Sequence, residues 1–353
     1  MSIVARLPGR RRPRRAGARL ACTILAACTA AAAAPSTAKA QAAPPPPITI
    51  GRVTVTGFVQ ADAIFSEAAD DDSEPAGTFV IPRARVGLGG DLTSKVSWYL
   101  QGDFSNLTND GRVLRDAYLQ FTASRQFAVR FGQLVAPFSL ERLTSYQKLE
   151  VIDRSVVGSL LAPSRDVGLM VFNVTPWRGW LTYGAALING SGQNQVDNNS
   201  AKDIVGRVAA NVPRVHGLTV GVNAQDGEQP LGHRRRVGLD LNLEGRQYRV
   251  AVERVAQHRD VAAETLDTTG VTVIGAFKHP AAHLTPHYAG YELAARYVDV
   301  EDDATLLESH NVQTGGTYFV TPQLRVQSNL LIPIGDDQPR HSVRWWSRLQ
   351  FYF

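Results

Sequence analysis

The chain has 353 residues, of which 20% are charged, with 37 basic and 32 acidic side chains. Removing residues 1–40, the signal peptide predicted below, takes away seven arginines, Lys39 and no acid, which leaves 29 basic against 32 acidic residues. The basic excess therefore belongs to the N-terminus and gives no argument for nucleic-acid binding. Both cysteines, Cys22 and Cys28, lie in the same segment, so the remainder has no thiol for a disulfide, a nucleophile or a metal site.

The N-terminus has the composition of an export signal. The seven arginines all precede Leu20, an apolar run extends to Ala34, and Ala38-Lys39-Ala40 fits an A-x-A cleavage site. The run is too short and too rich in alanine for a membrane-spanning helix of about 20 residues. We therefore predict a cleaved signal peptide over residues 1–40. Processing before Cys28, which would keep that residue as a lipid anchor, stays open.

After the signal, a proline-rich leader over residues 41–49 precedes a long region of strand-like alternation. Val53, Val55 and Val59 fall on one face of the first segment, while Thr54 and Gln60 fall on the other. The same two-residue period recurs throughout the chain, and no apolar run of about 18 residues follows the signal, which excludes helical membrane spans.

The end of the chain distinguishes a soluble sandwich from a membrane barrel, since both have alternating strands. A barrel turns its apolar face to lipid and its polar face to an aqueous lumen. The last strand is apolar and aromatic on one face and ends on Phe353, similar to the signal that the outer-membrane barrel assembly machinery recognises. Residues 50–353 are thus predicted to form an all-β transmembrane antiparallel β-barrel of about 16 strands.

Three other constellations compete with this interpretation. Ser155, Ser159 and Ser164 lie near acids, but no Gly-x-Ser-x-Gly elbow is present and no histidine lies in that half of the chain. His279, His283 and His287 have helical spacing for metal ligands, but Pro280 and Pro286 argue against a helix. Asp70 to Glu74 lacks the spaced ligands of a calcium loop. We expect no enzyme activity, no cofactor and no metal.

Residues 79–192 resemble the phosphate-selective porin O and P family. The segments that carry the resemblance are Ile81-Pro82-Arg83-Ala84-Arg85-Val86, Tyr99-Leu100-Gln101-Gly102-Asp103-Phe104, Leu114-Arg115-Asp116-Ala117-Tyr118-Leu119, Phe131-Gly132-Gln133, Pro137-Phe138-Ser139-Leu140-Glu141-Arg142, Ile152-Asp153-Arg154-Ser155, Pro163-Ser164-Arg165-Asp166-Val167-Gly168 and Asn189-Gly190-Ser191-Gly192. Each is weak alone, and their order and spacing are specific.

The resemblance implies a homotrimeric outer-membrane porin that passes small anions such as phosphate, with a long third loop, here residues 134–165, folded inward. Basic side chains line such a pore because guanidinium stays charged at all relevant pH values. The pore-lining candidates are Arg83, Arg85, Arg130, Arg142, Lys148, Arg154 and Arg165. Expected partners are small anions, outer-membrane lipid, lipopolysaccharide and the assembly machinery, which binds Phe353.

Two alternatives remain. The candidate arginines could instead pair with acids and hold wall and loop together; those acids are Asp103, Asp116, Glu141, Asp153 and Asp166. The family is known for lysine-rich capture sites, whereas only four lysines follow the signal, which puts phosphate itself in doubt. A barrel with a plugged lumen, acting as an adhesin or hydrolase, is the competing function.

Overall fold

The computed structural model describes residues 48–50, 52–66, 77–107, 112–230, 232–261, 264–279, 290–304, 309–334 and 343–353. The predicted signal peptide, the start of the leader and the segment Asp70 to Glu74 lie outside these residues, as do His283 and His287. Strand β1 (Ile48–Ile50) includes the end of the predicted leader and pairs with β2 (Val53–Ser66). No helix among the described residues is long and apolar enough to cross a membrane.

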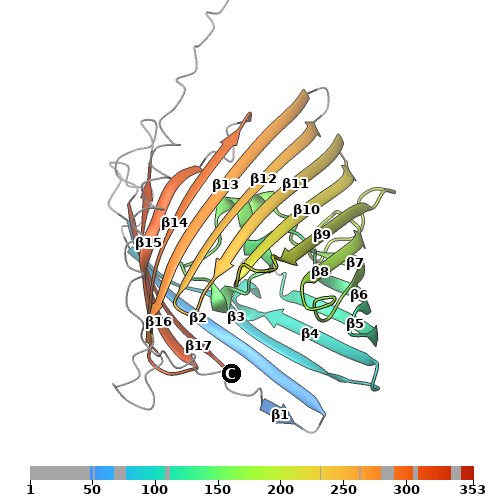
Figure 1. Ribbon diagram of the computed structural model, residues 1–353, viewed down its shortest axis with the longest axis horizontal. Helices are drawn as coiled ribbons and strands as arrows, with labels where there is room; N and C mark the ends of the chain where they lie inside the picture. The colour runs from blue at the N-terminus through green and yellow to red at the C-terminus, as the bar shows by residue number, and fades with distance from the viewer. Residues whose placement is uncertain are drawn as a thin grey trace, which may run out of the picture. The chain divides into compact units, whose positions relative to one another are not determined.

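Strands β2 to β17 of the described chain form one closed antiparallel barrel of 16 strands (Figure 1). Each strand pairs with its neighbour in sequence, and β17 returns to pair with β2, which confirms the predicted architecture. The strands after β2 are β3 (Gly77–Asp91), β4 (Val96–Asp103), β5 (Leu114–Ser124), β6 (Phe127–Val135), β7 (Arg165–Phe172), β8 (Leu181–Ile188), β9 (Asp203–Asn211), β10 (Leu218–Gln229), β11 (Gly232–Glu244), β12 (Tyr248–Val261), β13 (Glu264–His279), β14 (Gly290–Asp302), β15 (Ser309–Phe319), β16 (Leu324–Pro333) and β17 (Arg344–Tyr352).

The two faces of the wall are inverted relative to a soluble protein. On β11, Val237, Leu239 and Leu241 are about half exposed, while Arg236 and Asp240, which alternate with them, are buried. A strand places successive side chains on opposite faces, so the apolar set points outward and the polar set points into the lumen. This arrangement suits a barrel whose outer surface contacts hydrocarbon.

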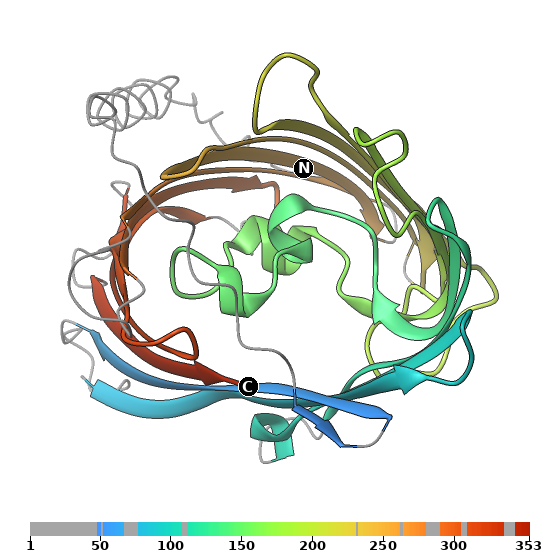
Figure 2. The same ribbon diagram turned by 60° about the horizontal axis from the view of Figure 1, so that its bottom comes forward.

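The longest connection, residues 136–164 between β6 and β7, folds into the lumen, where Figure 2 shows it inside the ring of strands. It contains α2 (Leu140–Leu143), the 3-10 turn η2 (Tyr146–Lys148) and the π-helical turn η3 (Val157–Leu161). The predicted limits of 134 and 165 were too wide, because Leu134 and Val135 still pair within β6 and Arg165 already pairs within β7. We call residues 136–164 the inward loop.

An apolar contact holds the inward loop against the wall formed by β10 to β14, which we call the far wall. Val157 and Leu161 of η3 are fully buried in a cluster that includes Val255 on β12 and Val298 on β14. Gly270 on β13 makes this contact possible, because a Cβ there would lie 2.7 Å from a methyl carbon of each η3 side chain. Part of the lumen wall is therefore apolar, where strict alternation predicted a polar face.

The seam between β17 and β2 is held by side chains as well as by its ladder. Arg348 donates to both carboxylate oxygens of Asp62 at 2.8 and 2.7 Å, and both side chains are almost fully buried. Beside this pair, Gln60 donates to Gln350 across the seam at 2.6 Å. The C-terminal residue Phe353 exchanges two backbone hydrogen bonds with Gly57, each 3.0 Å long.

We predict that Asp62→Ala weakens barrel closure, because it removes both hydrogen bonds of the buried Arg348 guanidinium to a carboxylate and leaves Asp153, 3.9 Å away, as its nearest counter-ion. The free energy of unfolding should fall by about 3–5 kcal/mol, measured by urea titration of the protein in lipid vesicles. Asp226→Ala is the matched control, since it breaks an exposed ion pair with Arg235 and should cost no more than about 1 kcal/mol. Equal losses in the two variants would contradict a special role for the seam pair.

Candidate functional site

The inward loop enters the lumen at Ser139, which begins α2. Its Oγ caps the helix by accepting a backbone N–H three residues on at 3.0 Å, and its own N–H donates to Asn223 on β10 at 3.0 Å. The carboxylate of Glu253 on β12 accepts the backbone N–H groups of Leu140 and Glu141 at 3.1 and 3.0 Å. The first turn of α2 is thus bonded to two strands of the far wall.

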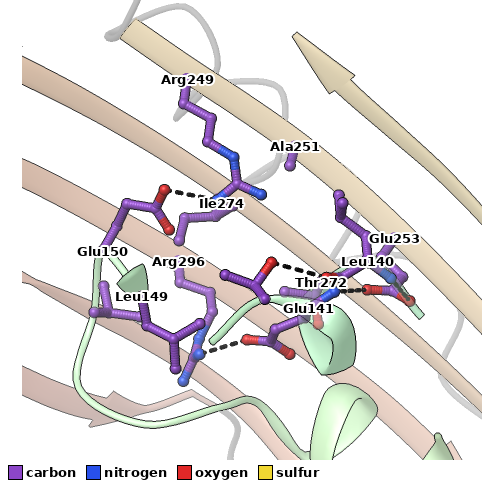
Figure 3. Close-up of a pocket in the computed structure, with 12 residues that line it drawn as sticks. Leu140, Glu141, Leu149, Glu150, Arg249, Ala251, Glu253, Thr272, Ile274 and Arg296 are labelled. Atoms are coloured by element: carbon purple, nitrogen blue, oxygen red, sulfur yellow. Dashed lines mark hydrogen bonds and ion pairs between the residues drawn. The ribbon is translucent and has the colours of Figure 1, made fainter. Parts of the chain in front are cut away.

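The two glutamates of the inward loop are turned toward that same wall. Glu141 accepts from Arg296 at 2.8 Å, and Glu150 accepts from Arg249 at 2.7 Å (Figure 3). Between loop and wall these residues border a cavity of about 30 Å³, large enough for a buried water. Both loop glutamates are therefore neutralised on the side of the loop that faces β12 to β14.

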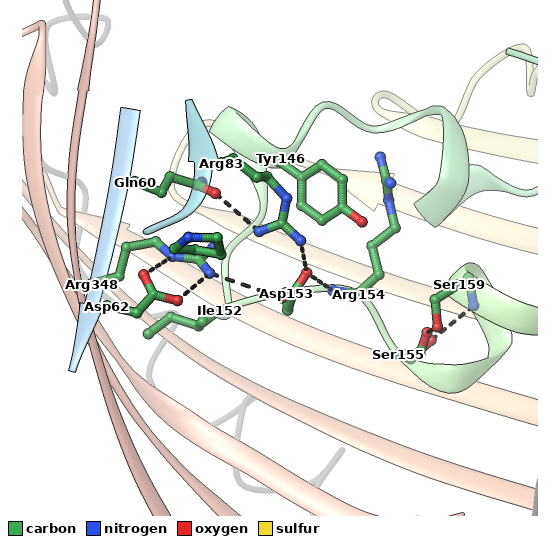
Figure 4. Close-up of polar contacts among 12 residues, drawn as sticks. Gln60, Asp62, Arg83, Tyr146, Ile152, Asp153, Arg154, Ser155, Ser159 and Arg348 are labelled. Atoms are coloured by element: carbon green, nitrogen blue, oxygen red, sulfur yellow. Dashed lines mark hydrogen bonds and ion pairs between the residues drawn. The ribbon is translucent and has the colours of Figure 1, made fainter. Parts of the chain in front are cut away.

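The third loop acid, Asp153, fastens the loop to the closure seam. Its Oδ1 accepts from Arg83 on β3 at 2.6 Å, and its Oδ2 lies 3.9 Å from Arg348 on β17 (Figure 4). Burial alone would raise the pKa of Asp153, but the charges of Arg83 and Arg348 outweigh it and hold the pKa below its ordinary value. The backbone of Asp153 has a φ of +68°, which a non-glycine residue rarely adopts.

Tyr146 of η2 is stacked between two guanidinium groups. Arg83 from the wall lies 3.5 Å from the ring centroid, and Arg154 from the loop lies 3.9 Å from it (Figure 4). Arg154 also donates to the backbone carbonyls of Glu141 and Thr144 at 3.1 and 2.6 Å. Cation–π contacts of this kind fix the planes of both arginines.

The wall from β3 to β7 adds three more arginines. Arg85 donates to Asp103 at 2.7 Å, and Arg115 lies 3.4 Å from the same carboxylate. Arg165 forms a two-pronged bond with Asp116 at 3.1 and 2.8 Å. These contacts leave more guanidinium than carboxylate groups on this side.

Arg142 of α2 completes the group and has the weakest local bonding. Among the described residues, its side chain donates one hydrogen bond, to the carbonyl oxygen of Gly158 at the long distance of 3.5 Å. Burial, together with the nearby charges of Arg154, Arg165 and Arg115, lowers the pKa of Arg142 to about 10. Residues from loop and wall thus meet in one cluster of cations, which we call the arginine cluster: Arg83, Arg85, Arg115, Arg142, Arg154 and Arg165.

The structure brings together five of the seven predicted pore residues. Arg130 lies apart on β6, where its guanidinium stacks 4.0 Å from the Tyr118 ring and donates to Gln120. Lys148 on η2 is exposed, and its ammonium has no hydrogen-bond or ion-pair partner among the described residues. Neither residue belongs to the arginine cluster.

Arg115 is a member that sequence alternation misses. Strict alternation along β5 would place Arg115 on the outward face with Ala117 and Leu119. The register of β4 with β5 shifts at Arg115, because Gln101 pairs with Asp116 and the next residue, Gly102, pairs with Leu114. A bulge of this kind re-aims one side chain. No sequence pattern marked this irregularity.

The alternative role of the arginines, as partners of wall and loop acids, is also realised in part. Three of the expected acids, Asp103, Asp116 and Asp153, pair with members of the cluster, whereas Glu141 pairs with Arg296. The remaining one, Asp166, instead accepts the backbone N–H groups of Val167 and Gly192. The pairs of Asp153 and Glu141 hold the loop, whereas those of Asp103 and Asp116 join strands of the wall. Within the cluster, six guanidinium groups face three carboxylates.

Ser155, one of the serines considered for catalysis, has structural partners. Ser155 Oγ donates to Glu141, accepts from Thr272 Oγ1 at 3.1 Å, and accepts the backbone N–H of Gly158 at 3.1 Å. None of the described histidines is hydrogen-bonded to it in the structure. Ser155 thus helps to seat η3 on the wall.

A closed 16-stranded barrel with a loop in its lumen defines the porin class of outer-membrane channel proteins. The family model of the phosphate-selective porins O and P matches residues 53–231, about half of the chain. The chain belongs to this family.

Solved porins share the fold. An anion-selective porin from Comamonas acidovorans aligns over 85% of this chain and 99% of its own, with a TM-score of 0.64 and 15% identity. OmpF of Salmonella typhi aligns over 86% and 98%, with a TM-score of 0.62 and 12% identity. The outer-membrane channel DcaP of Acinetobacter baumannii aligns over 85% and 97%, with a TM-score of 0.58 and 14% identity. No curated protein sequence matches significantly.

We predict that Asp153→Asn loosens the inward loop at neutral pH. A carboxylate whose pKa is lowered by folding stabilises fully above its unfolded pKa of about 3.9 and loses this contribution as pH falls through the lower folded value. The native open-channel current should therefore be quiet from pH 7 to about 4 and noisier below, while Asp153→Asn should be noisy already at pH 7.

The control for this prediction is Asp197→Asn, which removes a partly exposed carboxylate paired with Lys202 on another loop. Its current noise at pH 7 should equal that of the native channel. Noise that is the same in the native protein and in Asp153→Asn at every pH would mean that Asp153 does not hold the loop.

Proposed function

We propose that this outer-membrane porin is a passive, anion-selective channel for small hydrophilic solutes. The observation that carries the proposal is the arginine cluster, in which guanidinium groups from the loop and from the β3–β7 wall outnumber carboxylates by six to three. Fixed cations in a narrow aqueous passage raise the local concentration of anions and repel cations.

The direction in which the loop acids point supports the same conclusion. Glu141 and Glu150 are turned away from the β3–β7 wall and are neutralised by Arg296 and Arg249. Arg142 and Arg154 remain on the side of the loop that approaches Arg115 and Arg165. Both borders of the proposed passage are therefore cationic.

A second group of cations leads toward the cluster from the ends of β11 and β12. Arg234 and Arg259 are register partners on these strands, and Arg236 follows Arg234 on the same inward face. Asp203 pairs with Arg234 at 3.0 Å, and Arg236 donates to the carbonyl of Leu160 on the inward loop. We propose that anions entering the lumen meet these arginines first.

The solutes that fit this passage are small anions, with phosphate among them. Arginine binds oxyanions through planar pairs of N–H donors, so a site without lysines retains phosphate chemistry. The exposed ammonium of Lys148 adds one donor on the loop. The fold neighbour from Comamonas acidovorans is described as anion-selective, which agrees with this choice.

Export and assembly follow from the same proposal. Residues 1–40 act as a cleaved signal peptide. The assembly machinery recognises Phe353 before β17 pairs with β2. The working form is a homotrimer, as described for a fold neighbour from Vibrio cholerae that was solved in a trimer form. Solutes diffuse down their gradients without a cofactor or energy coupling.

The test compares Arg142→Gln with Arg130→Gln, which removes the same charge outside the arginine cluster. One charge about 6 Å from a permeating ion contributes about 0.7 kcal/mol in water. Losing the charge destabilises a permeating anion and stabilises a permeating cation by this same amount. Arg142→Gln should therefore lower the anion-to-cation permeability ratio by roughly tenfold, measured as a shift in reversal potential in a salt gradient. Arg130→Gln should shift it much less.

Equal shifts in the two variants would assign selectivity to the net charge of the lumen and not to the cluster. A native channel that prefers cations would overturn the proposal. Competition between phosphate and chloride for the native current, measured in the same bilayers, decides whether phosphate is among the solutes.

A further inference from the structure

The outward face of β10 to β13 is apolar and is bordered by a polar row near one end. Asp226, Arg235, His258 and Asp267 occupy directly paired positions on these four strands. Two ion pairs link them, Arg235 with Asp226 at 3.1 Å and His258 with Asp267 at 2.5 Å. The row lies where β10 is joined to β11 and β12 to β13, which is the end of the barrel that also bears the inward loop. Such a row marks the depth at which the wall leaves hydrocarbon for the headgroup layer.

Arg254 lies below this row on the lipid-facing surface. Its neighbours Glu253 and Val255 on β12 are buried and point into the lumen, so the side chain of Arg254 points outward. Its partners in the ladder are Leu239 on β11 and Val271 on β13, which are apolar. Within the described residues, the exposed guanidinium of Arg254 has no hydrogen bond and no ion pair.

Arg235, the other outward-facing arginine of these four strands, is paired with Asp226, and His233 and His258 also contact aspartates. Arg254 has no such partner among the described residues, although it stands deeper than these three on the same surface. A charge at such a position is costly in hydrocarbon, so the side chain is expected to extend toward the headgroups.

The position of Arg254 along β12 decides which of the two headgroup layers its side chain can reach. His258 lies four residues from Arg254 on the same face, roughly 13 Å along a tilted strand, whereas Tyr248 at the opposite border lies six residues away, roughly 20 Å. Arg254 is therefore nearer the loop end, and long loops project from the outer face of the outer membrane. The anion present in the headgroup layer of that face is the phosphate of lipopolysaccharide.

We propose that Arg254 binds a headgroup phosphate of lipopolysaccharide on the outer surface of the β11–β13 wall. A guanidinium donates two parallel N–H bonds to a phosphate, which compensates for the apolar surroundings of the side chain. A second copy of the chain is a poorer partner, because the paired neighbours of Arg254 on both sides are apolar and Asp299, two strands away in the same row, is already bound to His310.

The experiment measures binding of bis-phosphorylated lipid A to the purified, detergent-solubilised full-length porin by native mass spectrometry. Arg254→Gln should weaken binding roughly tenfold, as expected for loss of one charge-assisted contact. Arg254→Lys, which keeps the charge but loses the pair of parallel bonds, should weaken it by less. The native protein should bind fully dephosphorylated lipid A as weakly as Arg254→Gln binds the phosphorylated form.

Arg246→Gln is the matched control, since Arg246 is an exposed arginine in the β11–β12 turn at the other end of the same wall. It should bind lipid A like the native protein. Equal binding by the native protein and Arg254→Gln, or equal loss in Arg246→Gln, would overturn the proposal. Dissociation of subunits in Arg254→Gln with unchanged lipid binding would also overturn it and assign Arg254 to a subunit contact.

Discussion

Every backbone N–H and C=O group at membrane depth must be paired within the protein, because hydrocarbon offers no alternative partner. Sixteen antiparallel strands meet this requirement only when β17 pairs with β2, and the rest of the structure depends on that closure. Once the ring is closed, most polar side chains at membrane depth point into the lumen. The buried pair of Arg348 and Asp62 then stabilises the seam from the inside.

The inward loop is anchored on the same lumen-facing polar side chains. Arg348 contacts both Asp62 in the seam and Asp153 in the loop, so closure and loop position share one guanidinium. Glu141 and Glu150 are held by arginines of β14 and β12. Since two of the three loop acids are engaged with these wall residues, the cations of the loop on its other side face one loop carboxylate, that of Asp153. The charge of the proposed passage is therefore a consequence of how the loop is anchored.

Sequence patterns predicted the elements that depend on local periodicity and on a family motif. These are the all-β class, the strand number, the long third connection and five members of the arginine cluster. Patterns failed where the fold departs from regularity. The bulge at Arg115 reverses its expected direction, and the apolar lumen contact around Val157, Val255 and Gly270 breaks strict alternation.

Other features could not be read from the sequence because they join distant segments. Arg249, Arg296 and Arg348 bind loop acids across separations of roughly 100 to 200 residues, and nothing in a single sequence identifies such partners. Parity correctly placed Arg130 on the inward face, but it carries no information on depth along the barrel. The structure puts that side chain against Tyr118, away from the cluster.

The central claim is that fixed arginine charge, left uncompensated by the anchoring of the loop, selects anions. The most direct test is the zero-current potential of the native porin in a planar bilayer that separates concentrated from dilute potassium chloride. Selection of chloride should make the dilute side negative. A dilute side that becomes positive would show selection of potassium and would contradict the account.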